Sequence, residues 1–289
     1  MDTKSGKNKI VALYILATII TLVITLILFS VFFLSDKIVP FFGSIIERAN
    51  ETSSGEDVSP KLTVSQETEN YQALIDKYTN YLNSNYLIVV NSENPLPEDY
   101  APPALSSISN SARQLEERAA AALEQLIAAA DAAGCERHIV ISGYRSAEEQ
   151  TQAFNTQVQA YMASGYTQTE AEALSAASVA RAGESEFQTG LLVELGESRN
   201  MTSDEFINTD FYNFLKDNAH LYGFVLRYPE NKETITGYSF NSMVFRYVGN
   251  VESSTYIYEN NLSLEEYIDY IRIAKLDAEQ NLEFLRENN

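Results

Sequence analysis

The feature that most constrains this chain is a stretch of 25 residues, Ile10 to Leu34, that contains no charged side chain. As a helix with a rise of 1.5 Å per residue, such a stretch is about 37 Å long, which is enough to cross the hydrocarbon core of a bilayer with some tilt. Lys4, Lys7 and Lys9 precede it. The positive-inside rule then places residues 1–9 in the cytoplasm and everything after the stretch on the extracytoplasmic side.

The alternative for this stretch is a signal peptide that is removed after export. Its apolar run is longer than a typical signal core, and Ser35, Asp36 and Lys37 do not form a small-x-small cleavage site. We therefore expect an uncleaved transmembrane anchor over residues 10–34 and a single-pass protein of the cell membrane.

The rest of the chain divides by composition into a spacer and a folded domain. Residues 35–70 become rich in Glu, Ser, Thr and Asn toward their end, which indicates an extracytoplasmic stalk. Residues 71–289 contain most of the apolar and aromatic side chains. Because 45% of the whole chain is hydrophobic, this part can bury a core, and we expect one folded domain that ends in a helix.

The charge of the chain disfavours a nucleic-acid-binding protein, and its cysteine content excludes a disulfide-stabilised scaffold. The chain has 20 basic and 40 acidic residues, a formal net charge of −20, so its general field disfavours nucleic acid as a partner. Cys135 is the single cysteine, so no internal disulfide can form. We expect it to be a small buried hydrophobic residue rather than a nucleophile.

Hydrophobic periodicity and capping residues predict helices and short strands in an α+β arrangement. Two capping boxes, Thr167 with Glu170 and Ser263 with Glu266, predict helix starts. Helices are expected over 111–133, 147–162, 168–181, 206–222 and 263–286, and strands over 87–90, 138–142, 224–228 and 245–248.

Four fragments stand in a fixed order along the predicted domain. They are N-P-L-P at 94–97, S-G-Y-R-S at 142–146, S-E-F-Q-T-G at 185–190, and T-G-Y at 236–238 followed by R-Y-V-G at 246–249. Together they resemble the VanY-type D-alanyl-D-alanine and L,D-carboxypeptidases, zinc enzymes that trim peptidoglycan stem peptides. The resemblance covers roughly residues 85–270. It implies a small antiparallel sheet flanked by helices, the VanY or hedgehog-type zinc peptidase fold.

The resemblance also implies where a catalytic zinc would be held. In the family, S-x-H-x-x-G-x-A-x-D supplies a His and an Asp ligand, and E-P-W-H supplies the general base and a third ligand. The matching positions in this chain are Phe187, Glu194, Asn241 and Val244. Phenylalanine and valine have no lone pair for zinc, and asparagine cannot accept a proton near neutral pH. The sequence therefore predicts that the zinc and the catalytic residues are lost, and that the domain is not an enzyme but a degenerate member of its family.

Other polar residues do not replace the missing ligands in the sequence. His138 and His220 are the two histidines, and neither lies at a family ligand position. We expect each to be a surface histidine or a core histidine with satisfied hydrogen bonds rather than a metal ligand. Glu184 and Glu186 are expected to be solvated loop carboxylates. The alternative is that Glu184, Glu186 and Glu194 form an oxygen-rich patch suited to weak calcium or magnesium contact.

Residues that the family places in its substrate pocket are retained. They are Arg145, Gln150 and Ser185. An arginine fork can pair with a peptide carboxylate through two parallel hydrogen bonds. The alternative, that Arg145 serves packing and buried hydrogen bonding alone, remains open from the sequence.

Three hypotheses on function follow. The first is a non-catalytic domain that binds a peptidoglycan stem peptide or an envelope protein in cell-wall remodelling. The second is an active D,D- or L,D-carboxypeptidase with a rearranged metal site. The third is a purely structural envelope module whose pocket is empty.

Overall fold

The computed structural model describes residues 63–102, 104–135 and 137–288. The predicted cytoplasmic tail, anchor and most of the stalk lie outside these residues. In the described part of the chain, no helix is both long and apolar enough to cross a membrane. The first described helix, α2, starts at Val64, so the last residues assigned to the stalk are helical.

The central element is a four-stranded antiparallel sheet in the order β3-β4-β6-β5. Its two inner strands are buried along nearly their whole length, which explains their apolar sequences. A separate two-stranded antiparallel sheet pairs β1 with β2. The α+β prediction is thus confirmed. The strands are β1 Leu105–Ser107, β2 Gln114–Glu116, β3 Ile139–Ser142, β4 Leu192–Gly196, β5 Phe224–Tyr228 and β6 Asn241–Tyr247.

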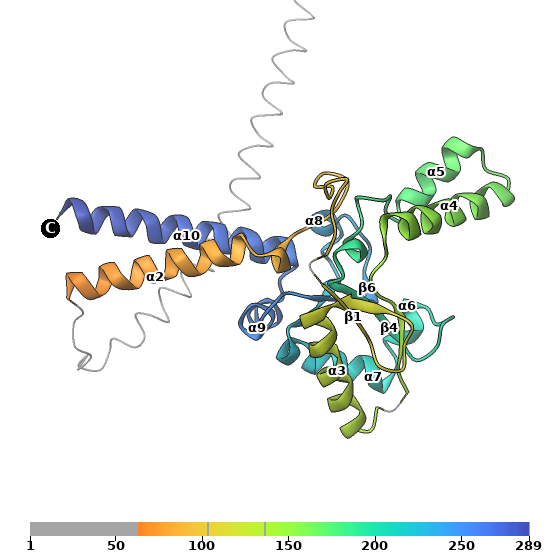
Figure 1. The fold of residues 1–289 in the computed structure, drawn as a ribbon, viewed down its shortest axis with the longest axis horizontal. Helices are drawn as coiled ribbons and strands as arrows, with labels where there is room; N and C mark the ends of the chain where they lie inside the picture. The colour runs from red at the N-terminus through yellow and green to blue at the C-terminus, as the bar shows by residue number, and fades with distance from the viewer. Residues whose placement is uncertain (1–62, 103, 136, 289) are drawn as a thin grey trace, which may run out of the picture. The chain divides into compact units, whose positions relative to one another are not determined.

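Helices flank the sheets, as the resemblance implies (Figure 1). The α-helices are α2 Val64–Leu82, α3 Glu117–Ala132, α4 Ala147–Ala163, α5 Gln168–Ala176, α6 Ser203–Phe206, α7 Asp210–Asn218, α8 Glu233–Thr236, α9 Val251–Glu259 and α10 Leu264–Glu287. Three 3₁₀ turns complete the fold, η1 Asn85–Leu87, η2 Glu186–Thr189 and η3 Ala219–Tyr222.

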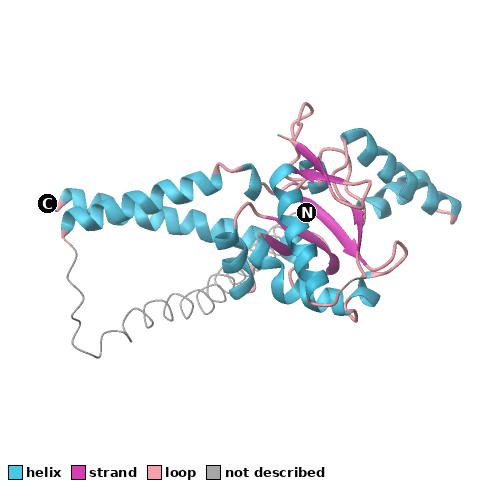
Figure 2. Ribbon diagram, turned by 60° about the horizontal axis from the view of Figure 1, so that its bottom comes forward, coloured by secondary structure: helices cyan, strands magenta, loops and turns pink. Residues whose placement is uncertain are grey.

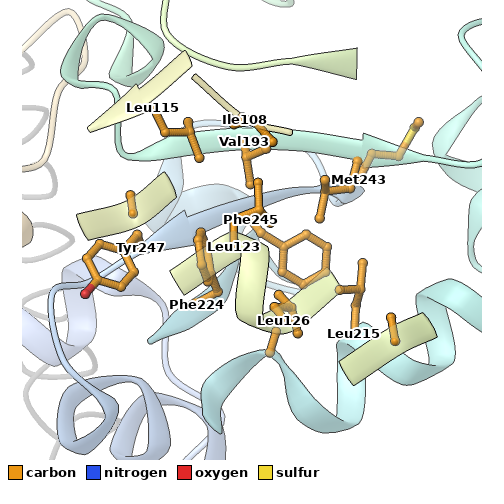
Figure 3. Packing of buried hydrophobic residues seen from close by; sticks show 14 of the residues in the cluster. Ile108, Leu115, Leu123, Leu126, Val193, Leu215, Phe224, Met243, Phe245 and Tyr247 are labelled. Atoms are coloured by element: carbon orange, nitrogen blue, oxygen red, sulfur yellow. The ribbon is translucent and has the colours of Figure 1, made fainter. Parts of the chain in front are cut away.

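The main core fills the space between the sheet and helices α3 and α7. Leu123 and Leu126 of α3 and Leu215 of α7 are fully buried in the same cluster as Val193 and Phe245 of the central strands (Figure 3). Burying one such side chain stabilises the fold by about 1.5–3 kcal/mol. This cluster fixes the position of the central strands.

A second core cluster attaches the C-terminal helix. Tyr267, Ile268 and Ile271 of α10 are buried with residues of η1, β5 and α9. Further along, α10 lies side by side with α2 (Figures 1 and 2). The apolar side chains of α10 are only partly buried, since Leu276 is 57% exposed.

Two of the predicted helices differ from the observed ones. One is shorter and the other is divided, because polar side chains cap the backbone N–H groups at positions where the sequence did not predict a helix start. The helix expected from residue 111 begins at Glu117, because the buried Glu116 carboxylate accepts the N–H groups of Arg118 and Ala119. The helix expected over 206–222 is divided into α6, α7 and η3, and the Thr209 hydroxyl caps α7.

The strand expected over residues 87–90 is not formed, so this prediction was wrong. The Ile88 carbonyl accepts a hydrogen bond from the Arg246 guanidinium at 3.0 Å. Backbone groups there are satisfied by a side chain from β6 rather than by a strand partner.

The prediction that Glu186 is a solvated carboxylate was also wrong, because Glu186 is 2% exposed and forms an ion cluster with two buried arginines. Arg227 donates to it at 2.8 Å from Nη2, and Arg246 donates at 2.6 Å from Nη1. Arg227 also pairs with Glu265 of α10 at 2.6 Å. We call this set, Glu186, Arg227, Arg246 and Glu265, the Glu186 ion cluster.

We predict that Glu186→Gln strongly destabilises the domain. The change leaves two buried guanidinium groups short of a counter-charge, which typically costs about 3–5 kcal/mol. Burial alone would raise the pKa of Glu186, but Arg227 and Arg246 outweigh it and lower that pKa below its usual range. The stabilisation is therefore present above the unfolded-state pKa of about 4.3 and is lost as pH falls through the lower folded-state pKa.

Urea unfolding of the wild type and Glu186→Gln at pH 7 and in acid tests this prediction. Glu279→Gln is the matched control, because Glu279 pairs with Lys275 on the partly exposed surface of α10, where such a pair contributes about 0.5 kcal/mol. Equal effects of the two changes would show that the buried ion cluster is not a major stabilising element.

Candidate active site

The antiparallel register places two of the expected site positions, Glu194 and Val244, beside each other and beside Ser142. Glu194 of β4 pairs with Ser142 of β3 on one side and with Val244 of β6 on the other. These side chains share one face because residues paired directly across antiparallel strands point the same way. That face is opposite to the one bearing Phe245 and the main core.

Arg145 reaches this face from the loop between β3 and α4. Its Nε and Nη2 donate to the Ser142 hydroxyl at 3.1 and 2.8 Å, and its Nη1 donates to Gln150 Oε1 at 3.4 Å. Gln150 is itself fixed by a 2.7 Å hydrogen bond from Nε2 to the Ala180 carbonyl. The guanidinium lies 4.3 Å from the centre of the Phe187 ring, within the range of a cation–π interaction.

Two motif glycines let the site segments approach each other. A Cβ on Gly143 would lie 2.5 Å from the Gln114 carbonyl oxygen, so no larger residue fits between Ser142 and Tyr144 without a shift of the backbone. Gly190 ends η2 with φ of 73°, and a Cβ there would lie 2.9 Å from the Glu116 nitrogen. These contacts give a physical reason for glycine in both motifs.

A cavity of about 440 Å³ joins the expected site positions, and we call it the site cavity. All seven residues singled out from the sequence line it, both the retained positions and the altered ones. They are Arg145, Gln150, Ser185, Phe187, Glu194, Asn241 and Val244. The structure thus brings these residues together, and it places neither His138 nor His220 among them.

Glu194 is the carboxylate on the sheet face of this cavity. Burial raises the pKa of its carboxyl group, while the nearby charges of Arg145 and Arg113 lower it, and the net shift is upward. Burial is also the main cause that lowers the pKa of the Arg145 guanidinium. No salt bridge within 4 Å joins Glu194 to Arg145 in the described part of the chain, so the carboxylate acts on the arginine only at longer range.

Sequence reasoning did not assign an aromatic wall of the site cavity. Tyr228, Tyr238 and Phe240 line it, and the rings of Tyr228 and Tyr238 are 4.9 Å apart. Residues 177–180, which follow α5, line another side. Tyr238 belongs to the T-G-Y fragment, so the sequence carried a signal, but nothing local showed that Tyr238 lines the same cavity as Arg145.

The residues at the family's metal positions do not fit a zinc ion held in the family's way. Zinc requires several nitrogen, sulfur or oxygen donors, and Phe187 and Val244 have none. The Asn241 Oδ1 accepts the backbone N–H of Met243 at 3.0 Å. Among the described residues, no group of three or more His, Cys, Asp or Glu side chains gathers where it could hold a metal.

Comparison with known proteins places this fold and cavity in a carboxypeptidase class. The model of the family "VanY: D-alanyl-D-alanine carboxypeptidase" matches residues 112–250. A D-alanyl-D-alanine carboxypeptidase of Enterococcus faecalis is 39% identical over 183 residues, which are 63% of this chain and 65% of that protein. The match therefore spans slightly less than two thirds of that relative.

Solved structures extend the likeness to the whole of some relatives. The vancomycin-resistance D,D-pentapeptidase VanY of a VanB-type cassette, solved as a point mutant with Zn(II), is 38% identical with a TM-score of 0.56, and the match covers 64% of this chain and 99% of that one. The same protein, VanYB, has been solved with D-alanine-D-alanine. The LD-carboxypeptidase LdcB, whose structure addresses peptidoglycan recognition, is 33% identical with a TM-score of 0.55, over 66% of this chain and 87% of its own.

This chain belongs to the VanY family of D-alanyl-D-alanine carboxypeptidases. The expectation that it is not an enzyme was wrong, because relatives 33–39% identical to it are named carboxypeptidases and the family's role is enzymatic. That expectation rested on single positions such as Phe187 and Val244. The loss of a donor at a position shows what that side chain cannot do, but it does not show what the remaining cavity does.

We predict that Glu194→Gln stabilises the domain at neutral pH by about 2 °C in Tm, because the change removes a partly desolvated charge. Since the folded-state pKa of Glu194 is raised, the wild type carries this cost above that pKa. The cost fades as pH falls toward the unfolded-state pKa of about 4.3, where both states are protonated. Thermal unfolding of both proteins between pH 4 and pH 8 measures the difference. An unchanged or lower Tm of the variant at pH 8 would contradict it.

Proposed function

We propose that this domain binds peptidoglycan stem peptides in the site cavity and that Arg145 anchors their C-terminal carboxylate. The observation that carries the proposal is the set of hydrogen-bond donors that Arg145 has left. A guanidinium has five N–H groups, and three of these donate to Ser142 and Gln150. One N–H on each terminal nitrogen remains, and this pair has the spacing of a bidentate carboxylate contact.

The surroundings of Arg145 support an anion-binding role. Ser142, Gln150 and Phe187 are neutral, so they orient the guanidinium without cancelling its charge. The cavity, at about 440 Å³, has room for a peptide terminus rather than a single ion. Ser185 lines the cavity as a further polar group. The aromatic wall offers contact for small apolar side chains, such as the methyl group of alanine.

The named activity of the relatives favours cleavage of the bound peptide as a second function of the same cavity. Glu194 is the lining carboxylate whose pKa burial raises, so it is the side chain that we assign to proton exchange with the bound peptide. Release of D-alanine from a pentapeptide ending in D-Ala-D-Ala, compared between wild type and Glu194→Gln, tests this function. Release that does not depend on Glu194 would assign the proton transfer elsewhere.

We predict that Arg145→Ala weakens binding of a pentapeptide ending in D-Ala-D-Ala by roughly tenfold to a hundredfold, since hydrogen bonds to charged groups are worth about 1.5–3 kcal/mol. Calorimetric titration of the full-length protein measures this. Amidation of the peptide C-terminus should weaken binding to the wild type by a similar factor and should not change binding to Arg145→Ala.

Arg181→Ala is the matched control for this titration. Arg181 stacks 4.4 Å over the Phe154 ring and does not line the site cavity, so its loss should leave peptide affinity within about twofold. Equal affinity of the free and amidated peptides for the wild type would refute the carboxylate anchor.

We also propose that the family's zinc positions in this chain no longer form a zinc site. The triple variant Phe187→His, Asn241→Glu, Val244→His would restore two imidazole ligands beside Glu194. After dialysis, we expect about one zinc per molecule in this variant and far less in the wild type, measured as metal content. The control is the triple variant Phe187→Leu, Asn241→Gln, Val244→Leu. Stoichiometric zinc in the wild type would show that other donors hold the metal.

A further inference from the structure

A second cavity, of about 460 Å³, lies at the free edge of the four-stranded sheet. It is formed by the turn 108–113, helix α3, strand β3 and Arg199. It shares no lining residue with the site cavity. We call it the β3-edge cavity.

The β3-edge cavity carries two cationic side chains without a directly paired carboxylate, although the charge of Arg113 also acts on Glu194 at longer range. Arg113 and Arg199 both line it, from segments far apart in the sequence, and neither side chain forms an ion pair or hydrogen bond with another described residue. This is unexpected in a chain with twice as many acidic as basic residues. By contrast, Arg227, Arg246 and Arg272 all pair with carboxylates.

The acidic side chains of the β3-edge cavity are already engaged. Glu124 Oε1 accepts the backbone N–H of Ser109 at 2.5 Å. Asp131 Oδ1 lies 2.7 Å from His138 Nε2. Both carboxylates keep their charge, but neither forms a salt bridge within 4 Å with Arg113 or Arg199, so the two guanidinium groups are not directly paired within the cavity.

The turn that carries Arg113 is set by its own hydrogen bonds. The Arg113 carbonyl accepts the Ile108 N–H at 3.0 Å, and the Arg113 N–H donates to the Ser111 hydroxyl at 3.1 Å. Asn110 adopts φ of 55° to close this turn. These hydrogen bonds fix the backbone from which the exposed Arg113 side chain extends into the cavity lining.

We propose that the β3-edge cavity binds a phosphate group carried on a sugar or polyol. Two unpaired guanidinium charges match a phosphate monoester, whose charge is about −1.5 to −2 near pH 7, better than they match a single carboxylate. The cavity is larger than phosphate alone, and Ile127, Ile139 and Val140 offer an apolar wall for the carbon skeleton. A phosphodiester within a polyol chain carries a single charge, so the match is to a phosphate monoester such as a sugar or polyol phosphate.

Calorimetric titration of the full-length protein at constant ionic strength tests the proposal with four probes: inorganic phosphate, glycerol 3-phosphate, glycerophosphoglycerol and glucuronate. We expect saturable binding of glycerol 3-phosphate and weaker binding of glycerophosphoglycerol, because its phosphodiester carries a single charge. Arg113→Ala combined with Arg199→Ala should weaken the binding of glycerol 3-phosphate at least tenfold. The length-preserving pair Arg113→Gln with Arg199→Gln should do the same if the alanine pair is unstable.

Arg137→Ala is the control for general charge effects. Arg137 is 83% exposed and does not line the β3-edge cavity, so its loss should change phosphate affinity less than twofold. Arg145→Ala should leave phosphate binding unchanged, which separates this proposal from peptide binding in the site cavity. Lack of saturable glycerol 3-phosphate binding, equal weakening in Arg137→Ala, or binding of glycerophosphoglycerol or glucuronate as tight as that of glycerol 3-phosphate would overturn it.

Discussion

The structure depends most on one buried carboxylate, that of Glu186. A carboxylate cannot be removed from water without compensation, and here the compensation comes from Arg227 of β5 and Arg246 of β6. Because Glu186 stands between Ser185 and Phe187, the same ion pairs fix the 3₁₀ turn that carries these two lining residues of the site cavity. The ion pairs that compensate the buried Glu186 charge therefore also fix this wall of the site cavity.

Glu186 carries one negative charge, whereas Arg227 and Arg246 together carry two positive charges. The further partners of these two arginines connect peripheral segments of the domain to its buried interior. Arg227 shares its fork with Glu265 of α10, so the C-terminal helix is held by charge as well as by its apolar face. Arg246 donates from Nη2 to the carbonyls of Tyr86 and Ile88, which anchors the segment between α2 and β1. Segments that meet nowhere in the sequence are therefore joined at one electrostatic centre. Removal of one partner is expected to affect all of them together.

Features with local causes were predictable from the sequence, and features with distant partners were not. The capping boxes at Thr167 and Ser263 form as expected, because each needs only residues three positions apart. The strand expected around Ile88 failed because its carbonyl is taken by Arg246, 158 residues away. Glu186 was misread for the same reason, since nothing beside it in the sequence shows that two arginines bury it. The lining residues of the site cavity were predicted from the order of the motifs, whereas the aromatic wall was recognised only in the folded structure.

Arg145 shows how an acidic protein can still present a cation for binding. Acidic partners are abundant in this chain, yet its guanidinium is held by a hydroxyl, an amide and an aromatic ring, none of which carries a formal charge. Glu194 acts on it electrostatically without a salt bridge, and burial makes that carboxylate easier to protonate. The net field of the chain repels anions at long range, so a peptide carboxylate gains its attraction only at contact distance. Discrimination of a free C-terminus from other anions then has to come from the geometry of the fork, because bulk charge works against all anions alike.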